Sequence, residues 1–388
     1  MDYAKVILKQ GKERSILRKH PWVFSGAVFG VSREINDGEW VQVVSNSGEI
    51  LATGFYSDKG SIVVRVIQFG SEDLATNFWK DKLFSAWNLR TQILDFNQTN
   101  AFRVIHGEGD NVPGLIIDFY NNNWILQAHS SGIYFQLKEI AAAIQYCFPQ
   151  FCETIYCKSK TTLPNIGTDF HLFGDKNEVV AKENGIKYAV NWLEGQKTGF
   201  FLDQRDNRFL LKEFSKGKKV LNTFCYTGGF SVYAMDGGAE LVTSVDISQK
   251  AVDLAAKNMD LNFPGSNHNA VAADVFDFMK ENKAFYDLIV LDPPAFAKSI
   301  KSKHTATQAY KRLNIAGFKA LAPNSVLFTF SCSQVIDDVL FYNTVAAAAI
   351  ESGRNIRVLH KLSQGPDHPV NIFHPEGSYL KGLVLYVE

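Results

Sequence analysis

A single cysteine follows a strand-like apolar run near the end of the chain. The stretch LFTFSCSQV places Cys332 between Ser331 and Ser333, directly after aromatic and β-branched residues. A thiolate is a nucleophile, and the carboxyl end of a strand in an open α/β sheet is where such sheets bind ligands. A free cysteine is also commonly a small buried core residue. The position of Cys332 at the strand end favours a nucleophile.

Three aspartates end three successive predicted strands. Asp246, Asp274 and Asp292 are the last residues of the stretches LVTSVD, NAVAAD and YDLIVLD. Parallel strands bring their carboxyl ends to one edge, and a buried aspartate without a partner is costly, so a shared ligand site explains this set. Asp274 also suits the N-cap of the helix that would begin with VFDFM.

The turn before these aspartates indicates which ligand they bind. The stretch NTFCYTGGFSVYA carries Gly228 and Gly229, which allow close approach of a ligand to the backbone. Asp246 follows about 20 residues later, where a carboxylate can accept both hydroxyls of a ribose. Neither G-x-G-x-x-G nor G-x-x-x-x-G-K-[ST] occurs, which disfavours a nicotinamide dinucleotide or a nucleoside triphosphate. A nucleoside without phosphates, beside a DPP turn, indicates S-adenosylmethionine.

The elements that must position these residues alternate between strands and helices from residue 185 onward. Such alternation predicts an α/β domain with a doubly wound, largely parallel sheet. Its strands are predicted at 218–224, 241–246, 269–274, 286–292, 325–331, 356–362 and 381–387. Earlier, residues 1–71 have the pattern of a small β-barrel and residues 72–184 that of a small α+β domain. We therefore predict three domains: 1–71, 72–184 and 185–388.

Composition limits the class of protein and its partners. The 388 residues hold 40 Lys+Arg and 40 Asp+Glu, so a polyanion must be held by local patches. Residues 1–20 and 297–312 are two basic stretches, each of which is alternatively a solvated face. No apolar leader or long apolar run occurs, which predicts a cytoplasmic protein without membrane contact. Five scattered cysteines without CxxC predict reduced thiols and no metal site.

An ordered set of motifs resembles the ribosomal RNA large subunit methyltransferase I family, class I S-adenosylmethionine-dependent enzymes. LKQGKERSILRKHPWVFSGAV is similar to the opening of the family's PUA domain, and RVIHGEGDNVPGLIIDFY to its central domain. GQKTGFFLDQRDNR, VLNTFCYTGGFSVYA, DPPAF, TFSCS and HPEGSYLKGL follow in the family's order. The resemblance covers nearly the whole chain. It implies a PUA-type RNA-binding barrel, a small α+β domain and a Rossmann-like methyltransferase domain.

The resemblance also implies roles for individual residues. Asp246 would hold the ribose of S-adenosylmethionine and Asp274 its adenine amino group. The turn that would wrap the methionine part consists of Asn222, Phe224, Tyr226, Thr227 and Gly228. The stretch from Asp203 through Gln204 to Arg205 would close over the cofactor. Cys332 is the implied nucleophile, and 5-methylcytosine in 23S ribosomal RNA is the implied product. Cys225 stands where relatives often have serine.

The chemistry of that product explains the need for a thiol. Carbon-5 of cytosine is a weak nucleophile, and addition of a thiolate to carbon-6 activates it. Asp292 is suited to hydrogen-bond the base at its ring nitrogen or exocyclic amine, and it belongs to both the catalytic and the cofactor set. The basic stretch 297–312 is expected to favour the thiolate. His368 is either a pocket residue or a structural histidine.

Two alternatives keep the same fold. Methylation of a base nitrogen needs no thiol, and DPPAF has alanine where the D/N-P-P-[FYW] motif has an aromatic residue. A non-catalytic RNA-binding ribosome assembly protein would have no use for the cofactor aspartates. The expected partner is large-subunit ribosomal RNA with its target base unstacked. The sequence does not determine which nucleotide is methylated or whether the protein forms a homodimer.

Overall fold

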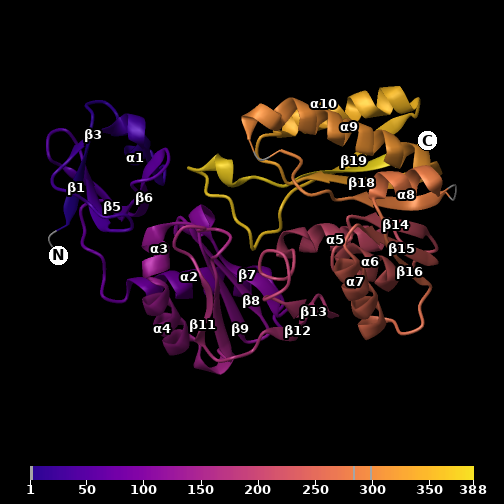
Figure 1. Ribbon diagram of the computed structural model, residues 1–388, viewed down its shortest axis with the longest axis horizontal. Coiled ribbons are helices and arrows are strands. Elements are labelled where there is room, and N and C mark those ends of the chain that lie inside the picture. Colours follow the sequence, from indigo (N-terminus) through magenta and orange to yellow (C-terminus); the bar gives the residue numbers. More distant parts are fainter. Residues whose placement is uncertain (1–2, 283–284, 298) are drawn as a thin grey trace. The chain divides into compact units, whose positions relative to one another are not determined.

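The computed structural model describes residues 3–282, 285–297 and 299–388 (Figure 1). The chain forms two compact units. The first comprises Met1–Asn184, Val190–Leu202 and Pro366–Gly377, and the second comprises Gly185–Ala189, Asp203–Gly365 and Ser378–Glu388. Lys298, part of the predicted basic stretch 297–312, lies outside the described residues. The predicted domain boundaries after residues 71 and 184 remain predictions.

The first unit begins with a six-stranded mixed sheet. Its strands are β1 (Ala4–Leu8), β2 (Trp22–Phe24), β3 (Val28–Val31), β4 (Trp40–Val44), β5 (Ile50–Tyr56) and β6 (Ile62–Phe69), with α1 (Arg14–Leu17) and the 3-10 turn η1 (Ser25–Ala27) between them. The order is β2-β6-β5-β4-β1-β3, with β1 parallel to β4. Val6, Val41 and Val64 are fully buried because alternate residues of a strand face the same side.

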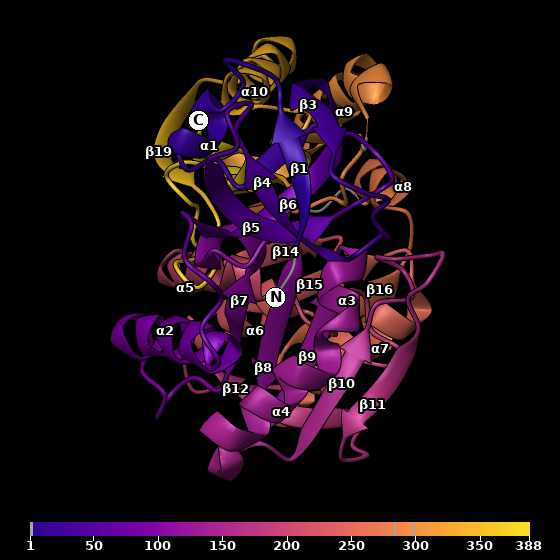
Figure 2. The ribbon, with the colours of Figure 1, turned by 90° about the vertical axis from the view of Figure 1, so that its left-hand side faces the viewer.

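A five-stranded sheet with three helices follows. It contains β7 (Ala101–His106), β8 (Leu115–Tyr120), β9 (Asn123–Ala128), β10 (Thr154–Lys158) and β11 (Asp169–Phe173), with α2 (Phe78–Ile93), α3 (Ser131–Phe135), α4 (Leu137–Cys147) and the 3-10 turns η2 (Gly107–Asp110) and η3 (Pro149–Phe151). Figure 2 shows these strands in the order β7 to β11. Trp87, Trp124 and Phe148 pack ring to ring in its core. Asn121 and Asn122 have positive φ, as the two-residue hairpin turn between β8 and β9 requires.

Buried polar contacts attach two later segments to this unit. The Thr198 hydroxyl donates to the carboxylate of Asp118 at 2.6 Å, and Asp118 is fully buried and paired with Arg103. The Asp367 carboxylate accepts the backbone N–H of Arg103 at 3.0 Å, and its carbonyl accepts from Arg90 at 2.7 Å. Because each contact satisfies a buried charge or polar group, segments 190–202 and 366–377 belong to this unit although they lie late in the sequence.

A hairpin lies where the chain passes from one unit to the next. Strands β12 (Glu178–Glu183) and β13 (Ile186–Asn191) form a two-stranded sheet. Asn184 and Gly185 connect them with φ values of 49° and 84°. This is the backbone of a tight hairpin turn, and asparagine followed by glycine is the favoured sequence for it.

The second unit is built on a seven-stranded sheet. Its strands are β14 (Lys219–Thr223), β15 (Leu241–Asp246), β16 (His268–Ala272), β17 (Tyr286–Leu291), β18 (Leu321–Ser331), β19 (Ile356–Leu362) and β20 (Lys381–Val387). The order is β16-β15-β14-β17-β18-β20-β19, and β20 alone runs opposite to the other strands, antiparallel to both β18 and β19. All seven predicted strands occur, so the predicted α/β fold is confirmed. The one large difference is that β18 begins at Leu321, four residues before the predicted start at 325.

Helices connect the successive strands of this sheet from β14 to β19, and one more helix precedes β14. They are α5 (Arg205–Glu213), α6 (Gly229–Asp236), α7 (Gln249–Asn262), α8 (Val275–Glu281), α9 (Lys303–Ala320) and α10 (Asp338–Ser352), with the 3-10 turns η4 (Leu202–Gln204), η5 (Ile300–Ser302) and, in segment 366–377, η6 (Pro375–Gly377). The strand order reverses direction at β14, which lies between β15 and β17. Ligands of open α/β sheets bind at the carboxyl ends of strands beside such a reversal.

Within the described ranges 3–282, 285–297 and 299–388, the helices are too short or too polar to cross a membrane.

One arginine fastens the far end of the second unit. The Arg354 guanidinium donates to the carbonyls of Phe318, Leu321 and Ala322, at 3.0 to 3.1 Å, and to the backbone carbonyl of Glu388 at 2.5 Å. These bonds cap the end of α9 and attach the last residue of the chain. The planar fork of arginine allows one side chain to serve all four acceptors.

Replacing Arg354 by methionine should lower the free energy of unfolding by about 2–4 kcal/mol, because several partly buried carbonyls lose a charged donor. Urea unfolding followed by circular dichroism measures the loss. Arg357→Met is the matched control, because Arg357 lies over the Tyr386 ring and makes an exposed ion pair with Glu388, contacts that are each worth about 1 kcal/mol or less. Equal losses in the two variants would contradict this assignment.

Candidate active site

The turn after β14 has an unusual backbone. Phe224, Tyr226 and Gly228 have φ values of 53°, 47° and 75°. Non-glycine residues rarely adopt positive φ, and surrounding contacts must hold them there. Here the N–H of Cys225 donates to the carbonyl of Val245, and the side chain of Asn258 donates to the carbonyl of Thr227, at 3.0 and 2.9 Å.

The glycine of this turn also faces a tight contact. A Cβ atom on Gly228 would lie 2.9 Å from the Cβ of Ala255 in α7. With its positive φ, this position therefore requires glycine. The predicted site residue Asn222 lies just before the turn, is buried, and donates to the Ser231 hydroxyl of α6 at 2.9 Å. Asn222 thus holds the strand to the helix that follows the turn.

Asp246 at the end of β15 is oriented by two backbone donors. One carboxylate oxygen accepts the N–H of Tyr226 at 3.0 Å, and the other accepts the N–H of Ser248 at 3.0 Å. The half-buried carboxylate keeps lone pairs for further donors, because each oxygen can accept more than one hydrogen bond. Two predicted site residues, Tyr226 and Asp246, are therefore in direct contact.

Asp274 performs the capping role considered in the sequence analysis. One of its oxygens accepts from the N–H groups of Phe276 and Asp277 at 2.8 and 3.2 Å, at the start of α8. The side chain is exposed, and its second oxygen can still accept from a ligand. The cap and a cofactor contact are therefore compatible.

Asp292 follows β17 and is held by Gln204. The amide nitrogen of Gln204 donates to the Asp292 carboxylate at 3.1 Å, and its amide oxygen accepts from Asn207 at 2.6 Å. Gln204 is 3% exposed and the neighbouring Arg205 is 1% exposed. In this arrangement Gln204 orients Asp292, while Arg205 forms an ion pair with Asp206 at 3.4 Å.

Cys332 lies one residue after β18 and is half-exposed. Its neighbours Ser331 and Ser333 are buried, and the Ser333 hydroxyl donates to the carbonyl of Ala297 at 2.7 Å. Parallel pairing of β17 with β18 puts Asp292 and Cys332 at the same edge of the sheet. Among these three consecutive residues, only the thiol is accessible to a ligand.

A buried ammonium group lies beside this thiol. Lys381 is 4% exposed and donates to the carbonyls of Ser333 and Tyr379, both at 2.7 Å. Burial lowers the pKa of Lys381, and the nearby charges of Asp338 and Cys332 oppose that shift. Sequence analysis missed this residue because its proximity to Cys332 follows from the antiparallel pairing of Ser331 with Lys381.

A buried phenol completes the surroundings of Cys332. Tyr310 of α9 is 1% exposed, and burial raises its pKa to about 12, with the charges of Cys332 and Asp292 acting in the same direction. Tyr310 is therefore a neutral hydrogen-bond donor at neutral pH. No sequence motif marks it, since α9 reaches this crevice only through packing on the sheet.

The other four cysteines have environments that disfavour thiolates. Burial raises the pKa of Cys152 and of Cys157 to about 11, and it also raises the pKa of Cys147. Burial, followed by the charge of Asp246, raises the pKa of Cys225 far above its usual value. Cys225 is therefore a poor nucleophile despite lying in the turn of the candidate site.

The structure also places His368 and the cations of the basic stretch 297–312. His368 belongs to the first unit, where it is buried with its ring nitrogen 3.0 Å from the Asp367 carboxylate. In the basic stretch 297–312, Lys303 pairs with Asp337 and Lys311 with Glu351. The cation whose pKa is raised by the charge of Cys332 is Lys381, which lies outside this stretch.

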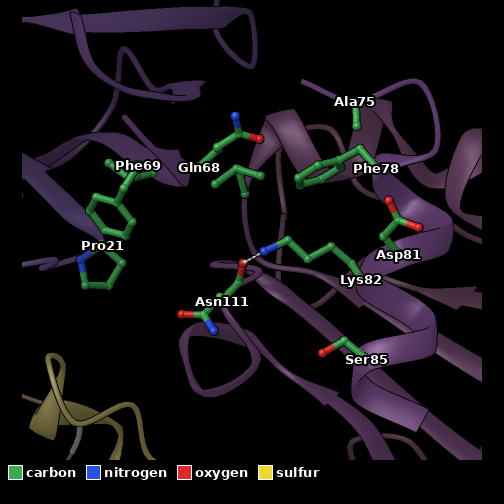
Figure 3. Close-up of a pocket in the computed structure, with 11 residues that line it drawn as sticks. Pro21, Gln68, Phe69, Ala75, Phe78, Asp81, Lys82, Ser85 and Asn111 are labelled. Carbon is green, nitrogen blue, oxygen red and sulfur yellow. Dashed lines mark hydrogen bonds between the residues drawn. The ribbon is translucent and has the colours of Figure 1, made fainter. Parts of the chain in front are cut away.

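A separate cavity of about 460 Å³ lies in the first unit (Figure 3). It is lined by the end of β6 and by α2, with the rings of Phe69 and Phe78 on its walls. The Lys82 ammonium donates to the carbonyl of Asn111 at 3.2 Å across it. None of the residues predicted for the site lines this cavity.

Comparisons with known proteins identify the family. Residues 6–69 match the family model of a PUA-like domain, and residues 168–375 match that of an S-adenosylmethionine-dependent methyltransferase. The chain is 39% identical over 394 residues to ribosomal RNA large subunit methyltransferase I of Aeromonas hydrophila, covering 98% of this chain and 99% of that protein. The protein of the same name from Vibrio cholerae is 38% identical over 394 residues, with the same coverage. The chain belongs to the ribosomal RNA large subunit methyltransferase I family.

Solved structures share the whole fold. A protein from Streptococcus mutans assigned as an S-adenosylmethionine-dependent methyltransferase has a TM-score of 0.85 at 26% identity, covering 99% of this chain and 100% of its own. A methyltransferase solved in complex with SAH has a TM-score of 0.85 at 27% identity, with the same coverage. The predicted fold class and the S-adenosylmethionine cofactor are thus confirmed.

The residues of the turn suit this cofactor. The turn after β14 is kept free of a side chain at Gly228, and the two oxygens of Asp246 retain acceptor capacity for ribose hydroxyls. A cofactor without phosphates needs no glycine-rich phosphate cradle, and the turn has none.

Asp246→Asn should weaken S-adenosylmethionine binding by about 10- to 100-fold, because the amide replaces one acceptor oxygen with a donor that faces a backbone N–H. Isothermal titration calorimetry measures the dissociation constant. Asp253→Asn is the matched control, because Asp253 is an exposed aspartate of α7 that accepts a hydrogen bond from Gln249. A dissociation constant equal to that of the wild type would argue against Asp246 as a ribose ligand.

Cys332 should be the first cysteine alkylated by iodoacetamide at pH 7. The other four thiols have raised pKa values, while the ammonium of Lys381 favours the thiolate of Cys332. Lys381→Met should slow this alkylation several-fold and move its pH profile upward. Peptide mass spectrometry over a pH series reads each thiol separately, with Lys361→Met as the control. Faster labelling of Cys147 or Cys152 would contradict the expected order.

Proposed function

We propose that this protein transfers a methyl group from S-adenosylmethionine to carbon-5 of a cytosine in large-subunit ribosomal RNA, through a covalent adduct of Cys332. The observation that carries the proposal is the partly exposed Cys332 at the end of β18, on the same edge of the sheet as Asp292 at the end of β17. Relatives that are named ribosomal RNA large subunit methyltransferase I support ribosomal RNA as the substrate. That substrate would place the reaction in the cytoplasm.

The thiol supplies what the base lacks. Attack of the Cys332 thiolate on carbon-6 of cytosine makes carbon-5 a nucleophile of the enamine type. S-adenosylmethionine, when bound, supplies an electrophilic methyl group. After carbon-5 is methylated, loss of its proton and departure of the thiolate restore the aromatic base. The accessible thiol of Cys332 is positioned for this role, and the buried thiol of Cys225 is not.

Residues around β14 and β15 would hold the cofactor. The turn containing Phe224, Tyr226 and Thr227 would wrap the methionine part, and Asp246 would accept the ribose hydroxyls. Asp274 would accept the adenine amino group with the oxygen that its helix cap leaves available. Gln204 is assigned to the cofactor region through its hydrogen bond to Asp292, and Arg205 as the residue that follows it; both side chains are buried.

Asp292 is assigned to the base. Its carboxylate accepts from Gln204, and this hydrogen bond orients it. A carboxylate here can accept from the protonated ring nitrogen or the exocyclic amine of cytosine, which stabilises the adduct. Gln204 is then a positioning residue that acts through Asp292.

Lys381 and Tyr310 support the reacting groups from the interior. The Lys381 ammonium stabilises the thiolate before attack and after elimination, because it is buried and weakly screened. Tyr310 remains protonated at neutral pH and can donate a hydrogen bond into the crevice. The negative charge of the Cys332 thiolate would thus be balanced by the buried Lys381 and not by an exposed cation.

RNA would be held by the first unit. The six cations of residues 1–20 are all exposed, namely Lys5, Lys9, Lys12, Arg14, Arg18 and Lys19. Phe24 and Phe29 are 43% and 70% exposed, as expected of rings that stack on unpaired bases. Trp40, by contrast, packs on Phe55 with ring centroids 3.9 Å apart and serves the core.

Unmodified large-subunit ribosomal RNA incubated with labelled S-adenosylmethionine should yield labelled 5-methylcytosine with the wild type, detected by nucleoside mass spectrometry. Cys332→Ala should lower the rate by at least about a thousandfold, because the covalent route is lost. Cys225→Ala is the matched control and should retain most activity. Label on a base nitrogen would favour the alternative N-methyltransferase, and absence of label together with absence of cofactor binding would favour a non-catalytic RNA-binding protein.

A further inference from the structure

Two histidines and a glutamate from distant parts of the sequence meet in the first unit. His20 precedes β2, while His374 and Glu376 lie at η6 in segment 366–377, which belongs to the same unit. One ligand atom from each of the three residues can be chosen so that all lie within 4.8 Å of one another. The spacing of the cysteines predicts no metal site, and this cluster contains no cysteine.

His374 is the unusual member of this group. It is 3% exposed, and neither ring nitrogen has a hydrogen-bond partner among the residues that the structure describes. The ring packs against the indole of Trp22 with centroids 4.3 Å apart. A buried polar group without a partner costs about 1–3 kcal/mol, so a ligand for these nitrogens would relieve a real penalty.

The geometry of the cluster suits a small cation. The Nε2 atoms of His20 and His374 each lie 3.8 Å from a carboxylate oxygen of Glu376. Ligand atoms around tetrahedral zinc, with bonds of about 2.0–2.1 Å, are about 3.3 Å apart. Rotation of the exposed Glu376 side chain and a small movement of His20 would close this difference.

The surroundings also resemble the outer shell of a metal site. The Nδ1 atom of His20 lies 3.2 Å from the backbone N–H of Trp22 and 3.3 Å from its carbonyl. Binding of a cation at Nε2 selects the tautomer in which Nδ1 carries the proton and donates to that carbonyl. The indole N–H of Trp22 donates to the carboxylate of Glu108 at 2.8 Å, which adds negative charge nearby. Trp22 thus contacts both histidines of the cluster.

We propose that His20, His374 and Glu376 bind a divalent transition-metal ion, with Zn²⁺ as the best match. Two imidazoles and one carboxylate are a zinc ligand set that leaves the fourth position to water. The ion would fasten segment 366–377 to the strand β2 of the same unit. Its role is structural, because the cluster contains none of the residues assigned to methyl transfer.

The test uses the full chain, treated with chelator and titrated with ZnCl₂ in a calorimeter. The wild type should bind one Zn²⁺ tightly, and His374→Leu should bind it at least about tenfold more weakly. His304→Leu, at an exposed histidine of α9, is the matched control and should bind as the wild type does. Glu376→Gln, at an exposed side chain, provides the same comparison if His374→Leu fails to fold.

Two further readouts decide whether the ion sits at this cluster. Zn²⁺ should raise the unfolding temperature of the wild type and of His304→Leu, but not that of His374→Leu or Glu376→Gln. Co²⁺ bound in place of Zn²⁺ should absorb in the visible without the near-ultraviolet band of a thiolate ligand. Unchanged affinity in His374→Leu and Glu376→Gln, or a thiolate band, would overturn the proposal and assign the binding to cysteines or to adventitious sites.

Discussion

The hydrogen bond between the Tyr226 N–H and the Asp246 carboxylate joins the ends of the first two strands of the methyltransferase sheet. It holds Tyr226 at a positive φ that its side chain disfavours, and it orients the carboxylate at the same time. The rest of the cofactor site depends on this arrangement. Gly228 can approach α7 only because the turn takes this path, and Asn222 and Asn258 hold the flanking backbone to α6 and α7.

The edge formed by β17 and β18 is organised differently. There, buried side chains donate hydrogen bonds to backbone carbonyls. Ser333 donates to one carbonyl and Lys381 donates to two. The thiol of Cys332 remains accessible near the buried ammonium of Lys381. The carboxylate of Asp292 is oriented by the hydrogen bond that it accepts from Gln204. Low local polarizability strengthens such charge interactions, so a few fixed groups can bias the reactivity of one thiol.

The first unit uses buried charges to retain distant segments. Asp118 and Asp367 receive donors from residues close in space and far apart in sequence. The same unit contains the His20, His374 and Glu376 cluster, in which the buried ring of His374 has no hydrogen-bond partner within the described part of the chain. The cluster differs from Asp118 and Asp367, whose carboxylates accept hydrogen bonds from Thr198 and Arg103.

The sequence by itself determined the strands of the α/β sheet, the turn after β14, the three aspartates and the thiol, because these features follow from local periodicity and from residues adjacent to strand ends. Tertiary structure alone decided which of those side chains are accessible and which groups surround them. Pairing of β18 with β20 brought Lys381 to Cys332, and helix packing brought in Tyr310. Cys332 is partly exposed, whereas Cys225 is buried and its pKa is raised. The sequence could not distinguish the two thiols, because desolvation depends on the packed fold and not on sequence spacing.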